Sequence, residues 1–132
     1  MGQPAAKQGD RVTATDIHIT LVPAPPGPPV PTPLPYSFNG IIDGGLSGDV
    51  KIAGMAAATV GSTATNTPPH VPQGVAFAKP PTNRATIIKG SLTVRINGKA
   101  AARNGDTALT CNDPVDMPGG QVVAQGTVNI GG

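Results

Sequence analysis

The chain has 132 residues, which fits a single domain over residues 1–132, and its formal net charge is +2. Aromatic residues make up 2% and charged residues 12% of the chain, whereas Gly (18) and Pro (16) are abundant. This composition excludes a core of bulky aromatic side chains and is not typical of a disordered chain, so we expect a small, turn-rich all-β protein. Nucleic-acid binding is not expected, because there is no Lys/Arg run and almost no aromatic side chain to stack on bases.

The N-terminal segment has no sign of an export signal. Residues 1–10 lack the apolar core of a signal peptide, and no apolar run is long enough to span a bilayer. We therefore expect the chain to be made in the cytoplasm. Its single cysteine, Cys111, excludes an internal disulfide framework.

In chain order, the predicted elements are three copies of one strand-turn-strand unit. The first copy lies within residues 1–22, the second covers 50–64, and the third covers 94–108 and aligns with the second without a gap over fifteen residues. The first copy lacks its V-x-I strand, and residues 122–132 supply one as Val-Asn-Ile-Gly. Because the first copy is split between the two ends, the termini must meet and close a ring of three units.

Each unit has a strand pattern followed by small residues. In V-x-I-x-G the two β-branched side chains alternate and therefore point to one face. The pair Asn97-Gly98 is a strong hairpin signal, and Gly54 has the same place in the second copy. We interpret the Ala-Ala-Ala run that follows as a short extended segment near a common axis, since small side chains permit close approach.

Proline-rich segments separate the copies. Residues 21–38 hold eight of the sixteen prolines. Because proline has no N–H to donate to a central sheet, we interpret residues 23–38 as a stiff strap along the outside of the body. A binding segment for a proline-recognition domain is the alternative. Residues 68–84 are interpreted as a second strap.

The rare metal-binding residue types fall at similar points in three loops. His18 and His70 each lie nine residues after a repeat glycine, and Cys111 lies six residues after the third. In a closed threefold structure these loops converge at one end. Imidazole and thiolate are the ligands that Zn²⁺ prefers, and Fe is a less favoured alternative. Metal binding would also add folding energy to a chain with little apolar area.

The fourth ligand stays open at this point. Asp16, Tyr36, Asp113 or a water molecule would each complete a tetrahedral site, although the two aspartates also suit turns. A nucleophilic Cys/His pair is a rival use of the same residues. The sequence offers no orienting group or oxyanion donor for it, so no catalytic residue is assigned.

The repeated units resemble the PAAR-repeat family, which is named after the motif seen here as Pro4-Ala5-Ala6-Lys7 and as Ala100-Ala101-Ala102-Arg103. The extended loops look most like the spike-tip proteins of phage-tail-like contractile injection systems, to which type VI secretion is related. The resemblance implies a small conical β-pyramid with zinc at its apex, bound by His18, His70 and Cys111. The family commonly uses three histidines and one cysteine, and here Tyr36 stands where close relatives often have histidine.

The resemblance also implies a function and partners. We expect a non-enzymatic, metal-stabilised tip that caps a homotrimeric β-helical spike, one tip per trimer, and helps to pierce the target membrane when the apparatus fires. The V-x-I strands at the base are the candidate interface, and cargo or effectors are further candidate partners. The tip would be assembled on an injection particle, including particles released outside the cell. A free-standing proline-rich module that recruits cargo is the alternative function.

Overall fold

Thirteen β-strands form the regular structure of residues 2–131, the part of the chain that this computed structural model describes. No helix occurs within these residues, so none is long and apolar enough to cross a membrane, and the predicted all-β class is confirmed. The strands are β1 (Gln3–Pro4), β2 (Arg11–Ala24), β3 (Gly27–Gly44), β4 (Lys51–Ile52), β5 (Met55–Ala56), β6 (Thr63–Asn66), β7 (Ala76–Phe77), β8 (Arg84–Ile87), β9 (Arg95–Ile96), β10 (Lys99–Ala100), β11 (Thr107–Thr110), β12 (Met117–Val123) and β13 (Asn129–Ile130).

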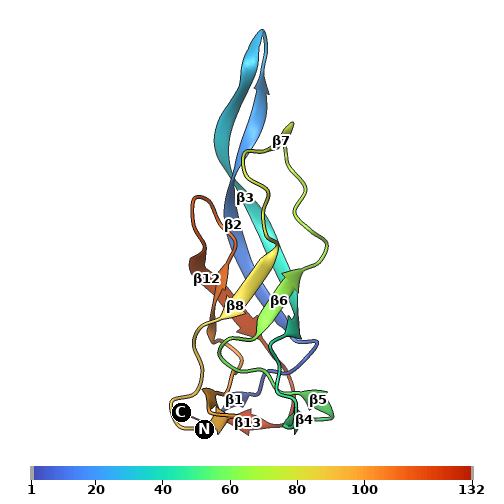
Figure 1. Ribbon diagram of the computed structural model, residues 1–132, viewed down its shortest axis with the longest axis vertical. Coiled ribbons are helices and arrows are strands. Elements are labelled where there is room, and N and C mark those ends of the chain that lie inside the picture. Colours follow the sequence, from blue (N-terminus) through green and yellow to red (C-terminus); the bar gives the residue numbers. More distant parts are fainter. Residues whose placement is uncertain (1, 132) are drawn as a thin grey trace.

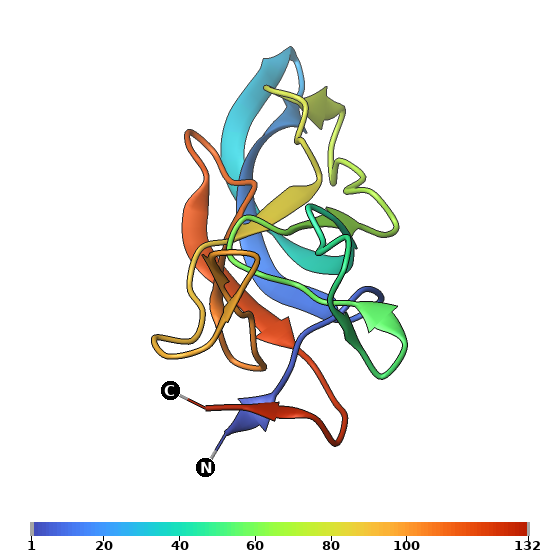
Figure 2. The same cartoon turned by 60° about the horizontal axis from the view of Figure 1, so that its bottom comes forward.

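Three two-stranded units form one end of the molecule, which we call the base. They are β4–β5, β9–β10 and β1–β13, and the last joins the two ends of the chain with Gln3 opposite Ile130. Figure 2 turns this end forward and shows β1 and β13 side by side. The end residues 1 and 132 lie outside the described part. Each unit contributes one isoleucine, 7–8% exposed, to a small apolar cluster at the base: Ile52, Ile96 and Ile130.

A closed ring of backbone hydrogen bonds joins the three copies at their alanine runs. Ala6 N–H donates to Ala102 O (2.9 Å), Ala102 N–H to Ala58 O (3.1 Å), and Ala58 N–H to Ala6 O (3.0 Å). All three residues are fully buried. Because the three segments approach one another this closely around one axis, a side chain larger than alanine would have no room. The ring gives the single chain a pseudo-threefold axis.

Above this ring, six strands form a closed sheet in the order β12–β11–β8–β6–β3–β2, with β12 paired back to β2. The main core lies inside it and is built from residues that alternate along the strands, such as Val12 on β2, Phe38 on β3 and Val122 on β12. The closed sheet leaves no free strand edge at this level. It therefore holds the inward-facing side chains of β2 and β3 in fixed places.

The proline-rich segment is not an outer strap, and that prediction is wrong. Residues 27–35 form the first half of β3 and pair with β2 up to Ala24 opposite Gly27, so the two strands project beyond the body as one hairpin (Figure 1). Pro31, Pro33 and Pro35 alternate along the strand, and Gln73 Nε2 donates to Pro35 O (2.8 Å) on the side away from β2. Because backbone groups alternate along a strand, the positions of these three prolines that lack an N–H all face the outer side. The hydrogen bonds to β2 are made on the other side and do not need them.

Residues 68–84 are largely irregular. They contribute β7, which pairs with β2 so that Thr20 lies opposite Phe77. This contact supports the lower half of the projecting hairpin. It also places the segment that carries His70 against the open end of the closed sheet.

Candidate metal centre

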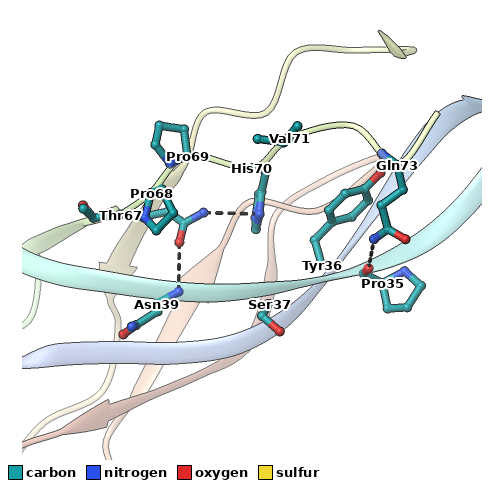
Figure 3. A pocket seen from close by; sticks show the side chains of 11 residues that line it. Pro35, Tyr36, Ser37, Asn39, Thr67, Pro68, Pro69, His70, Val71 and Gln73 are labelled. Carbon is teal, nitrogen blue, oxygen red and sulfur yellow. Dashed lines mark hydrogen bonds between the residues drawn. The ribbon is translucent and has the colours of Figure 1, made fainter. Parts of the chain in front are cut away.

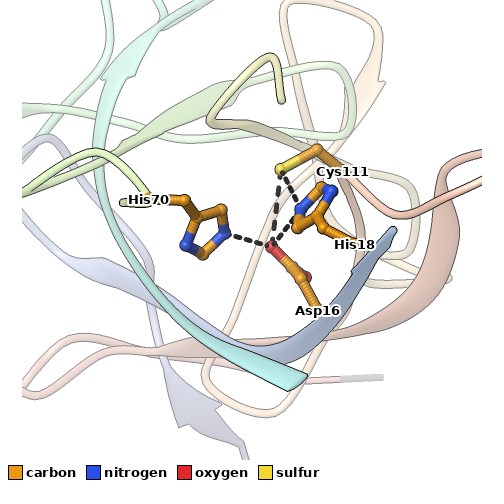
Figure 4. Close-up of side chains that lie close together, drawn as sticks. All are labelled: Asp16, His18, His70 and Cys111. Atoms are coloured by element: carbon orange, nitrogen blue, oxygen red, sulfur yellow. Dashed lines mark hydrogen bonds and ion pairs between the residues drawn. The ribbon is translucent and has the colours of Figure 1, made fainter. Parts of the chain in front are cut away.

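Four side chains that offer metal ligands meet inside the upper end of the closed sheet. Asp16 and His18 come from β2, His70 from the loop after β6, and Cys111 from the residue after β11. One potential ligand atom from each lies within 4.8 Å of all the others. Figure 4 shows the four side chains pointing toward one another. The structure thus brings together the three predicted ligands and one of the three protein candidates for the fourth position.

Oδ2 of Asp16 is the common contact of the cluster. It lies 2.9 Å from His70 Nε2, 3.4 Å from Cys111 Sγ and 4.0 Å from His18 Nε2. The Sγ atom of Cys111 is 3.7 Å from His18 Nε2. All four side chains are at most 3% exposed. Two nitrogens, one sulfur and one carboxylate oxygen converging in a water-poor site form a donor set that fits Zn²⁺.

The strand β2 positions both Asp16 and His18, because residues two apart in a strand point to the same face. The second carboxylate oxygen of Asp16, Oδ1, is held from below. It accepts hydrogen bonds from Thr110 Oγ1 (2.6 Å) and from Asn112 Nδ2 (3.4 Å). With Oδ1 occupied, Oδ2 is the oxygen that faces the cluster.

His70 is held from the opposite side by two asparagines. Its backbone N–H donates to Asn83 Oδ1 (2.8 Å), and its ring Nδ1 lies 3.2 Å from Asn66 Nδ2. Asn66 is itself fixed, because its Oδ1 accepts from Asn39 N–H (2.9 Å). These contacts turn Nε2 of His70 toward Asp16.

An open pocket lies on the outer side of His70 (Figure 3). Its walls include Tyr36, Asn39, Asn66 and Gln73. The pocket reaches the Nδ1 side of the imidazole and not the cluster itself, since the His70 side chain is 3% exposed.

Burial sets the protonation states of His18 and Cys111. It lowers the pKa of His18, so the imidazole is neutral at neutral pH, which is the form that binds a metal. Burial, together with the nearby Asp16 carboxylate, raises the pKa of Cys111 to about 11, so the thiol keeps its proton until a metal displaces it. Nδ1 of His18 has no hydrogen-bond partner and lies 3.6 Å from Asp113 Oδ2.

The sequence profile of the PAAR motif matches residues 36–117, more than half of the chain. The chain belongs to the PAAR-motif family. PAAR proteins are spike-tip components of type VI secretion and related contractile injection systems. No curated protein sequence matches the chain. The matched stretch contains His70 and Cys111, whereas Asp16 and His18 lie before it.

In this PAAR protein, Tyr36 and Asp113 lie beside the cluster and are not part of it. The Tyr36 hydroxyl is 2.6 Å from Thr20 Oγ1 and accepts from Gln73 N–H (3.0 Å), while its ring packs 5.5 Å from the ring of His70. Oδ2 of Asp113 accepts from Ile19 N–H (2.8 Å) on the outer side of His18. The geometry therefore favours Asp16 for the fourth position.

The surroundings of Cys111 do not suit a nucleophile. The residue is 2% exposed, and a thiol with a pKa of about 11 holds almost no thiolate at neutral pH. Its nearest carboxylate, Asp16, disfavours the thiolate further. This environment argues against the rival Cys/His enzyme.

Proposed function

We propose that this PAAR protein is a non-enzymatic, metal-stabilised tip that caps a homotrimeric β-helical spike and leads it through the target envelope. The observation that carries the proposal is the pseudo-threefold base at one end of a single chain, with a four-residue ligand cluster toward the other end. A threefold base from one chain matches a true threefold partner surface. The tip would sit at the end of the injection particle, one chain per trimer.

The base offers the partner an apolar contact in or beside each repeat. Three exposed apolar side chains lie at this end: Met55 (40%) in the second copy, Val128 (43%) in the split first copy, and Leu92 (88%) two residues before the third copy. The isoleucines of the V-x-I strands, in contrast, pack inward in the small cluster at the base. Docking on the spike would cover both these apolar side chains and the free edges of the short hairpins.

The metal would pin three segments that are far apart in the sequence. Asp16 and His18 on β2, His70 after β6 and Cys111 after β11 would share one ion, which ties the upper loops to the closed sheet. Nitrogen and sulfur donors in a small buried site favour zinc over iron as the resident ion. The bound metal would make the leading end rigid, since its binding energy becomes folding energy.

The test is to mix the zinc-loaded chain with a trimeric fragment of a β-helical spike protein and to measure mass by light scattering. A stable complex of one chain and three spike chains is expected. The substitution Leu92→Asp should weaken it by placing a charge in the apolar contact, whereas Val115→Asp, at an exposed apolar position (61%) away from the base, should not. Absence of any complex at micromolar concentrations would refute the tip and leave the free-standing module.

A further inference from the structure

The outer end of the β2–β3 hairpin, residues 21–31, projects alone from the end of the molecule opposite the base (Figure 1). We call it the arm. Below it, β7 pairs with β2 as far as Leu21 opposite Ala76; beyond that point the two strands of the arm pair only with each other. From His18 in the metal centre to Ala24 at the turn, the rise of about 3.3 Å per residue gives a reach of roughly 20 Å.

The arm has no charge. No Lys, Arg, Asp or Glu occurs between Asp16 and Asp43, although the whole chain has sixteen such residues, nine basic and seven acidic. Its side chains are mainly proline, alanine and valine, and Val30, which pairs with Val22, is 50% exposed. Burying a charge is the largest cost when a protein segment leaves water for hydrocarbon, and the arm does not incur it.

The open edges of the arm are also poor in backbone donors. The outer edge of its β3 strand carries Pro31, followed by Pro33 and Pro35 in the same register, and its β2 strand carries Pro23. None of these residues has an N–H. An unpaired N–H costs free energy in lipid, and on an edge strand in water it invites pairing with another chain. Proline removes both problems at once.

We infer that the arm enters the outer leaflet of the target membrane ahead of the metal centre. The arm itself rises roughly 10 Å from Leu21 to Ala24. The hydrocarbon core of a bilayer is about 30 Å thick, so an arm of this length reaches past the headgroups into one leaflet and does not span the membrane. Lipid fits the arm better than a proline-recognition groove, since such grooves bind a free polyproline II segment and the two strands of the arm are paired with each other. The inference rests on the proposed function in one respect, namely that the end opposite the base is the leading end.

A tryptophan reporter tests insertion directly, because the chain has no tryptophan of its own. The zinc-loaded variant Val30→Trp is mixed with phosphatidylcholine vesicles at millimolar lipid. We expect its emission to shift to the blue, to be quenched by brominated acyl chains, and to be unaffected by 0.5 M salt. The control Leu92→Trp, an exposed position at the base, should show neither shift nor quenching.

Paired charge substitutions separate this inference from the spike-capping proposal. Val30→Asp should weaken vesicle binding about ten-fold or more, from the cost of a charge in hydrocarbon, and leave zinc content and spike binding unchanged. Leu92→Asp should weaken spike binding and leave vesicle binding and zinc content unchanged. Loss of both activities by one variant with normal zinc content would contradict the separate surfaces that we assign.

Three results would overturn the inference. The first is no spectral change of Val30→Trp with vesicles. The second is binding that needs anionic lipid and disappears in salt, which would assign it to the lysines and arginines of the body. The third is binding to intact cells that protease treatment of the cells abolishes while vesicles of their lipids are not bound, which would make the partner an envelope protein.

Discussion

Oδ2 of Asp16 lies 2.9 Å from Nε2 of His70, although the two residues are 54 positions apart in the chain. The contact joins β2, one of the two long strands, to a largely irregular loop. Asp16 is fully buried, and a buried carboxylate requires partners that compensate its charge. A cation bound between Asp16 and His70 would provide that compensation.

The substitution Asp16→Asn should lower zinc affinity about ten-fold or more, because it removes the negative ligand and keeps the shape of the side chain. Competition with a chromogenic chelator measures the change. Asp43→Asn, at an exposed position on β3, is the matched control and should bind zinc like the unmodified chain. Equal affinity of the two variants would mean that another group completes the site.

Zinc affinity should rise with pH because binding expels the thiol proton of Cys111. The raised pKa of about 11 means that each unit of pH between 7 and 9 increases the thiolate fraction, and with it the apparent affinity, about ten-fold. His18 contributes little to this slope in the same range, since its pKa is lowered and the imidazole is already neutral. Titrations against a chelator at three pH values test this.

The variant Cys111→Ser is the control for the pH effect. It should bind zinc weakly and lose most of the slope, because no thiol proton is displaced. A slope that persists in Cys111→Ser would assign the released proton to another group. The unmodified chain should also show a thiolate-to-cobalt charge-transfer band when cobalt replaces zinc, and the variant should lack it.

The substitution Asn66→Asp should strengthen zinc binding. Asn66 Nδ2 faces His70 Nδ1 at 3.2 Å, whereas a histidine that binds metal through Nε2 carries a proton on Nδ1 and requires an acceptor there. A carboxylate at position 66 would accept that proton and still accept Asn39 N–H. We expect about a ten-fold gain by calorimetry.

The control for this substitution is Asn66→Leu, which removes the side-chain contacts to His70, Asn39 and Asn83 and should weaken zinc binding and lower thermal stability. If Asn66→Asp also weakened binding, His70 would bind the metal through Nδ1 or would not bind it. The comparison therefore reads out the ring nitrogen that is used. A purely structural role of Asn66 would instead lower the thermal stability of both variants in the absence of zinc.

The chain turns after each alanine run, at residues 7–10, 59–62 and 103–106, which we call the three corners. The same hydrogen bond recurs at each corner and should contribute a similar free energy in each. The backbone N–H of the first corner residue donates to the side chain three positions later, as in Lys7 to Asp10, Thr59 to Ser62 and Arg103 to Asp106. The change Ser62→Ala should destabilise the protein by about 1–3 kcal/mol, since it leaves a buried N–H unpaired.

Urea unfolding of the zinc-loaded chain measures this free energy. Thr127→Ala, at an exposed position near the C-terminus, should change the free energy of unfolding by less than about 0.5 kcal/mol. Asp106→Ala should destabilise at least as much as Ser62→Ala, because it also breaks the ion pair with Arg103 at 2.9 Å. Equal stability of all three variants would contradict this account of the corners.

Some of the site was predictable from residue types alone. The spacing of His18, His70 and Cys111 from the repeat glycines predicts that they share one site. The structure places them together because those glycines mark equivalent turns around the axis. Asp16 was one of several open candidates. Its choice over Asp113 depends on which face of β2 and which side of His18 each carboxylate occupies, and this is a matter of strand register.

The proline-rich segment shows the limit of local reasoning. Alternating prolines at 31, 33 and 35 exclude pairing on one side of a strand only, and the sequence did not reveal that the other side would face β2. The result is a projecting hairpin where a strap was predicted. Whether a strand tolerates proline depends on which side its neighbouring strand lies, and only the tertiary structure shows that side.

By itself, the sequence determined the all-β class and the spacing of the metal-binding residue types, because alternation, turn glycines and alanine runs act over a few residues. Only the tertiary structure decided that Asp16 faces His70, that Tyr36 turns away to Thr20, and that the arm stands free beyond β7. The physical reason is that these contacts join segments tens of residues apart. Closure of the sheet brings them together, and no local pattern records that closure.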